Sequence, residues 1–123
     1  MHANIIDNSG CPAFLTEERC EIEELSNGSH DEGLSVARAS VAPGITTAWH
    51  ILHQIDERYV IQSGTGDVEV GDLPLQRVYP GDVVVIPAGV RQRIHNPDSN
   101  QALVFLALCT PRFKAAAYES LEL

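Results

Sequence analysis

Long apolar runs and a secretory leader are both missing from this 123-residue sequence. The longest apolar stretches, Val83–Ile86 and Ala102–Cys109, fall far short of the roughly 20 residues that a membrane-spanning helix needs. The segment Met1–Asn8 has neither the basic start nor the apolar core of a secretory signal. These absences predict a cytoplasmic protein with no membrane partner.

Basic residues are also scarce, because eight of them stand against 17 acidic residues and give a formal charge of -9. Such a charge repels phosphate backbones and anionic lipid surfaces. We therefore expect no nucleic-acid partner. The acidic excess is most simply a solvated surface.

Cysteine is present only as Cys11, Cys20 and Cys109, an odd and widely spaced set without a CxxC pair. A disulfide framework has a denser and even set. Cys20 and Cys109 lie in apolar alternations and are expected to be buried, reduced thiols without a catalytic role.

What recurs along the chain is a short strand followed by a turn signal, a pattern typical of an all-β sandwich or barrel. The length suits one domain, 1–123, with N-terminal strands in 1–42, a central part in 43–96, and a last strand and tail in 97–123. The expected strands are Cys20–Leu25, Leu34–Val41, Trp49–Leu52, Tyr59–Ile61, Val68–Val70, Gln76–Val78, Val83–Ile86, Gln92–His95 and Gln101–Thr110.

Only the tail has a helical pattern. Thr110 before Pro111 fits an N-cap followed by proline at the first helical position. Phe113, Ala117 and Leu121 then share one face at four-residue spacing. The sequence predicts a short C-terminal helix that packs its apolar face on the outside of the barrel.

Two segments in the central part carry polar residues at regular spacing. The first contains, in order, Gly44, His50, His53, Glu57 and Gly64. The second contains Gly81, Pro87, Gly89, Gln92 and Asn96. Alternate residues of a strand share a face, so side chains from neighbouring strands can converge inside a barrel. Buried imidazole and carboxylate groups are costly unless they are hydrogen-bonded or bind a metal, and together they suit first-row transition metals.

The two segments resemble the paired motifs of the cupins, G-x5-H-x-H-x(3,4)-E-x6-G and G-x5-P-x-G-x2-H-x3-N. The glycines, the proline, Glu57 and Asn96 all fall in register. This resemblance implies an all-β fold, the double-stranded β-helix or cupin jelly-roll barrel, with the predicted C-terminal helix added. It also implies a mononuclear site for a divalent first-row metal: Fe, Mn, Ni, Zn or Cu.

The first motif departs from the family pattern because its histidines, His50 and His53, lie three residues apart instead of two. In one alignment His50 is the first histidine of the motif, and in the other His53 is the second. In an ideal strand the two side chains point to opposite faces, although a bulge could bring both inward. Both remain candidate metal ligands, and His53 is equally a candidate surface residue.

The second motif has Gln92 where the family has histidine. An amide oxygen is a weaker metal ligand than imidazole, so Gln92 is either a ligand or a hydrogen-bonding residue of the pocket. The predicted metal ligands are therefore His50, His53, Glu57 and Gln92. Tyr59 shares the face of Glu57 and is the candidate catalytic residue.

The resemblance implies two functions from different classes. One is a metal-dependent enzyme of the dioxygenase, isomerase or lyase type that acts on a small organic molecule. The other is a non-catalytic module that binds a small molecule and has a degenerate or empty metal site. We expect the chain to pair as a homodimer, which is compatible with both functions.

Overall fold

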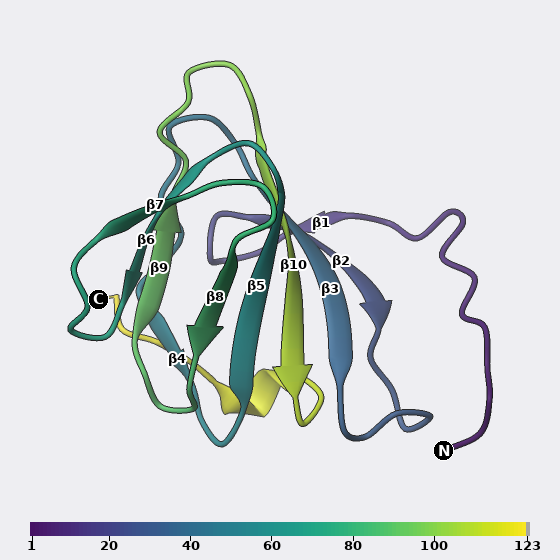
Figure 1. Cartoon of the computed structure of the whole chain (residues 1–123). Helices are drawn as coiled ribbons and strands as arrows, with labels where there is room; N and C mark the ends of the chain where they lie inside the picture. The colour runs from purple at the N-terminus through teal and green to yellow at the C-terminus, as the bar shows by residue number, and fades with distance from the viewer. Residues whose placement is uncertain (123) are drawn as a thin grey trace.

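The strands form two antiparallel sheets that face each other, as the computed structural model of residues 1–122 shows (Figure 1). The six-stranded sheet has the order β1 (Phe14–Leu15), β2 (Glu21–Ser26), β3 (Ser35–Val41), β10 (Leu103–Thr110), β5 (Asp56–Ser63) and β8 (Val83–Ile86). The five-stranded sheet has the order β11 (Tyr118–Ser120), β4 (His50–Leu52), β9 (Gln92–His95), β6 (Gly66–Val70) and β7 (Gln76–Val78). The predicted double-stranded β-helix is confirmed. Residues 1–13 precede both sheets and lead away from the barrel as an arm.

The core lies between the two sheets because each strand alternates inward and outward side chains. The pattern is clearest in β10, which pairs with β3 on one side and β5 on the other. Its buried residues Leu103, Phe105, Ala107 and Cys109 alternate with partly exposed ones. Within the described residues, no helix has the length and apolar character to cross a bilayer.

The motif residues that cannot bind metal hold the ends of the strands together. Gly64 has a φ of 77°, and a Cβ there would lie 2.5 Å from the carbonyl oxygen of Ala102, so only glycine fits. Asn96 is fully buried, and its Nδ2 donates to the carbonyl oxygens of Val41 and Gln101, both at 2.9 Å. The two motifs thus fix the loops at one end of the barrel.

The prediction of a C-terminal helix is wrong. The tail contains a 3-10 turn, η1 (Ala115–Ala117), followed by β11, which pairs with β4 through Tyr118 opposite Leu52 and Ser120 opposite His50. A short isolated helix is marginal in water, whereas the edge of β4 offers backbone partners. Phe113 and Ala117 do pack on an apolar cluster, as their spacing indicated, but Leu121 remains 42% exposed.

The first testable consequence concerns Asn96. Asn96→Ala removes both donors from two backbone carbonyls in the barrel wall, and we expect it to lower the free energy of unfolding by about 2–4 kcal/mol. Urea denaturation at pH 7 measures this change. Asn100→Ala, at an exposed position, is the matched control and should leave stability within about 0.5 kcal/mol. Equal effects of the two variants would contradict the assigned role of Asn96.

Candidate active site

His50 is buried in β4, directly opposite Gln92 of β9, with only 2% of its surface exposed. Its Nδ1 lies 2.8 Å from the carbonyl oxygen of Ala48. Because a carbonyl only accepts, Nδ1 carries the proton and donates, which leaves the lone pair of a neutral imidazole on Nε2. That Nε2 lies 3.9 Å from Oε2 of Glu18. In its neutral form His50 therefore presents an acceptor to the barrel interior.

Glu57, Gln92 and Tyr59 form a buried hydrogen-bonded chain across the two sheets. Gln92 Nε2 donates to Glu57 Oε1 at 2.8 Å, and the Tyr59 hydroxyl donates to Gln92 Oε1. Gln92 is 0% exposed, so its amide can satisfy both neighbours only in this orientation. Tyr59 also packs against Phe105, with ring centroids 4.3 Å apart. The amide thus positions the carboxylate of Glu57, and the phenol positions the amide.

The Glu57 carboxyl has its pKa raised from 4.5 to about 7, mainly because burial disfavours the charged form. The hydrogen bond from Gln92 opposes this rise, as does His50 when its ring is protonated, while the nearby Glu18 carboxylate adds to it. Burial also holds the pKa of Tyr59 well above its usual value. Glu57 can therefore exchange a proton near neutral pH, whereas Tyr59 keeps its proton and donates it to Gln92.

A cavity of about 170 Å³ lies beside this cluster, on the inner face of the six-stranded sheet. Glu57 and Tyr59 from β5 lie in its wall, together with Ala107 and Cys109 from β10. Cys109 Sγ lies 3.7 Å from the second carboxylate oxygen of Glu57. The cavity is the place where a small molecule can reach the titrating carboxyl.

Glu18 is the cavity residue that sequence reasoning missed. It precedes β2, lines the cavity and keeps only 25% of its side-chain surface exposed. Burial raises the pKa of this carboxyl as well. It lies outside both motifs in the acidic run Glu17-Glu18, which is indistinguishable from a solvated surface in the sequence alone.

The structure does not bring His53 to this cluster. Its side chain is 52% exposed, and its Nε2 contacts Glu119 Oε1 at 2.6 Å. The reason is the alternation of β4, in which His50 and Leu52 are buried, so the residue after Leu52 faces outward. No bulge of β4 turns the His53 side chain inward. Of the two expected positions, ligand or surface residue, His53 occupies the surface one.

Two arginines next to Gln92 lie outside the barrel, as strand alternation predicts. The guanidinium carbons of Arg91 and Arg93 are 5.0 Å and 4.3 Å from the ring centroid of Trp49. Arg93 also pairs with Glu69 at 2.9 Å. Neither arginine contributes to the lining of the cavity.

The donor set does not fit a metal centre. The Gln92 oxygen already accepts from Tyr59, and both oxygens of Glu57 face donors, from Gln92 and Cys109. Among residues 1–122, no group of three His, Cys, Asp or Glu side chains is placed to hold an ion. The polar atoms of the cluster satisfy one another, and all buried side-chain N and O atoms described have a partner.

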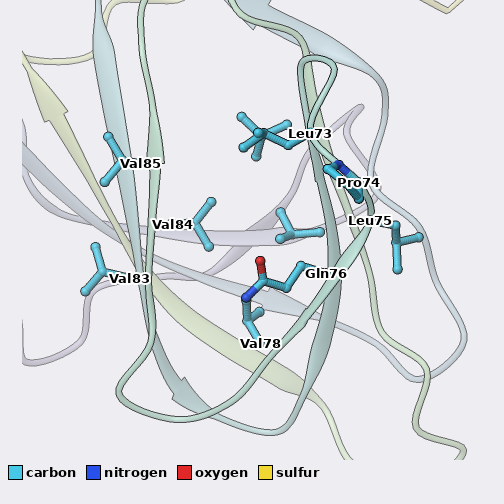
Figure 2. Close-up of a pocket in the computed structure, with 10 residues that line it drawn as sticks. Leu73, Pro74, Leu75, Gln76, Val78, Val83, Val84 and Val85 are labelled. Atoms are coloured by element: carbon cyan, nitrogen blue, oxygen red, sulfur yellow. The ribbon is translucent and has the colours of Figure 1, made fainter.

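A larger hollow of about 330 Å³ lies between β7 and β8 (Figure 2). Val84 of β8 points toward the segment from Leu73 to Val78, whereas Val83 and Val85, which also border the hollow, point to the other side of the strand. Its lining contains no ionisable side chain. The smaller interior cavity, by contrast, has the titrating carboxyl of Glu57 in its wall.

Comparison with known proteins agrees with this fold. A family model for the cupin domain matches residues 37–109, which is more than half of the chain. No match was found among curated protein sequences.

Several solved structures have the same fold at low sequence identity. Pac13 of Streptomyces, a nucleoside dehydratase, has a TM-score of 0.80 at 13% identity, over 98% of this chain and 92% of its own. A predicted oxalate decarboxylase from Thermotoga maritima has a TM-score of 0.76 at 22% identity, over 88% and 99%. KdgF from Halomonas has a TM-score of 0.74 at 16% identity, over 89% and 96%.

The raised pKa of Glu57 predicts a pH-dependent stability. Between pH 4.5 and about 7 the folded chain binds more protons at Glu57 than the unfolded chain, so stability falls as the pH rises through this window. Glu57→Gln removes the charge, and we expect it to raise the free energy of unfolding at pH 8 on the order of 1–3 kcal/mol. The gain should vanish below about pH 4.5, where both forms are neutral.

Urea denaturation at pH 4 and pH 8 measures the difference between the wild type and this variant. Glu21→Gln, at an exposed position of β2, is the control and should show no such dependence. A loss of stability in Glu57→Gln that is the same at both pH values would contradict the assignment.

The donor set also predicts how the chain responds to chelation. We expect protein purified without added metal to hold far less than one equivalent of any transition metal, and excess EDTA to leave its Tm unchanged. Elemental analysis and a thermal melt measure both quantities. One ion per chain that is lost in His50→Ala would overturn the interpretation of the donor set.

Proposed function

The chain belongs to the cupin family, and we propose that it is a small-molecule enzyme of the isomerase or lyase type in which Glu57 transfers a proton. The observation that supports this best is the place of Glu57: a buried carboxyl, held by Gln92, in the wall of an interior cavity. A general acid or base is most effective when its pKa lies near the working pH. Glu57, with a pKa of about 7, meets that requirement.

The proton transfer itself needs only residues of this chain. The ionised Glu57 accepts a proton from a C–H bond next to a carbonyl of the substrate, and the electron pair of that bond moves toward the carbonyl. An isomerase returns the same proton at another atom. A lyase delivers it to a hydroxyl on the neighbouring carbon: the electron pair returns from the carbonyl to form a C=C bond, the C–O bond breaks, and the hydroxyl leaves as water. Both courses balance without an oxidant or a reductant.

The neighbours of Glu57 support this role in two ways. The Nε2–H of Gln92 stabilises the carboxylate and fixes the direction of its oxygens. The lone pair on His50 Nε2 provides a second acceptor at the same end of the barrel. Tyr59 keeps its proton and is proposed as a positioning residue that acts through Gln92.

The structural neighbours support a small organic molecule as the occupant. A variant of Streptomyces PAC13, with a TM-score of 0.80 and 14% identity, has been solved with uridine. Pac13 is itself a dehydratase, and loss of water is a lyase reaction of the kind proposed here. At these identities the likeness concerns the fold alone. The substrate class of this chain therefore has to be inferred from its own cavity.

A non-catalytic binding module is the second candidate, and Gln92 is the observation that favours it. An amide does not titrate, so a glutamine in the motif position of a histidine removes one proton carrier from the site. In that case the same cavity would retain its ligand unchanged.

Solvent exchange tests the proposal whatever the product of the reaction is. Wild-type protein is incubated in D₂O with a panel of small carbonyl compounds, and loss of the C–H signal is followed by proton NMR. We expect exchange with at least one compound, at a rate that rises as the pH passes about 7. In Glu57→Gln the rate should fall about 10²–10⁴-fold.

Glu21→Gln is the control for this experiment and should keep the wild-type rate. Retained exchange in Glu57→Gln would contradict the role of Glu57. A compound that binds in the cavity while no member of the panel exchanges would favour the binding module.

A further inference from the structure

The cavity wall carries charge of one sign only. Its ionisable carboxyl groups are Glu18, Glu24 and Glu57, and no lysine or arginine of the described residues lines it. Two nearby arginines form ion pairs outside the cavity: Arg19 pairs with Glu122, and Arg93 pairs with Glu69. Interactions between charges are stronger in a buried site than in water, so an anionic ligand would be repelled.

Glu18 is a partly exposed carboxylate at the cavity, and the protein offers it only a weak thiol donor. Its two nearest polar contacts are His50 Nε2 and Cys20 Sγ, both 3.9 Å from Oε2. Within residues 1–122 no N–H or O–H group donates to its carboxylate at hydrogen-bond distance. With a quarter of its side-chain surface exposed, the carboxylate is free to accept a charged hydrogen bond from a ligand. A ligand that enters the cavity with N–H groups would supply them.

The remaining walls fit a small apolar body. Phe14, Phe105 and Phe113 line the cavity together with Tyr59 and Ile22. The volume of about 170 Å³ slightly exceeds that of a cavity of about 150 Å³ that accommodates benzene. Aromatic faces also attract cations. The size of the cavity, its aromatic walls and its acidic side chains therefore favour one kind of ligand.

We propose that the cavity binds a small organic cation, a primary amine on a body of about the size of one ring, and that Glu18 accepts hydrogen bonds from its ammonium group. The inference rests on the proposed function only in placing the ligand in the same cavity. Glu57 then lies beside the ligand for proton transfer, and Glu18 determines which charge is admitted.

The groups that face Glu18 set the conditions of the test. The Glu18 carboxylate interacts electrostatically with four neighbouring groups: His50, Glu57, Cys20 and Tyr118. At pH 8 Glu57 is ionised, because its pKa is about 7. Cys20, with a pKa raised to about 12, remains a neutral thiol. Low ionic strength keeps screening of the remaining charges small.

Three probes of similar size and different charge test the proposal at pH 8: benzylamine, benzyl alcohol and benzoate. Their dissociation constants are measured by calorimetry with the full chain. We expect benzylamine to bind about tenfold or more tightly than benzyl alcohol, the ratio typical of a charged hydrogen bond, and benzoate not to bind. Glu18→Gln should remove the tenfold advantage and leave benzyl alcohol within about twofold.

Glu17→Gln, the exposed neighbour, is the matched control and should change neither affinity. Equal or tighter binding of the alcohol or benzoate overturns the cation assignment, as does an unchanged benzylamine affinity in a folded Glu18→Gln. Failure of all three probes to bind overturns it too. Binding of benzylamine together with unimpaired proton exchange in Glu57→Gln would sink the proposed function and leave the cation site intact.

Discussion

Burial of the Glu57 carboxyl is the constraint around which the interior of this barrel is arranged. An ionised carboxylate in an apolar wall is costly, and the chain meets that cost with one strong donor, the Gln92 amide. Gln92 in turn needs a donor for its own oxygen, and Tyr59 supplies it. Each polar group is thus satisfied by the next, and the orientation of the carboxylate is determined by the whole chain of bonds.

This arrangement explains why the glutamine position matters in the present barrel. An imidazole at position 92 would carry its donor and its acceptor on two sides of a ring, whereas the Gln92 amide presents both at the end of one side chain, to Glu57 and to Tyr59. With glutamine there, the same geometry holds a carboxyl whose pKa is near 7. The glutamine at this position therefore supports the proposed proton transfer at Glu57.

The sequence predicted the fold well because turns are local. Glycine and proline positions such as Gly64 mark conformations that other residues cannot adopt, and strand alternation correctly placed Tyr59 on the same inward face as Glu57. The tail was mispredicted because its helical spacing is local, whereas the backbone partners that make it a strand belong to β4, far away in the chain. Glu18 had no local signal at all: only the folding of the first strands against the barrel brings it near His50.

The proposed acid–base site depends on the titration of the Glu57 side-chain carboxyl, and carbon-13 NMR of that carboxyl measures it directly. A midpoint near pH 7 in the wild type, shifted upward when Gln92→Leu removes the donor, is the predicted result. A midpoint near 4.5 in the wild type would mean that the carboxyl is solvated, and the proposed acid–base site would be refuted.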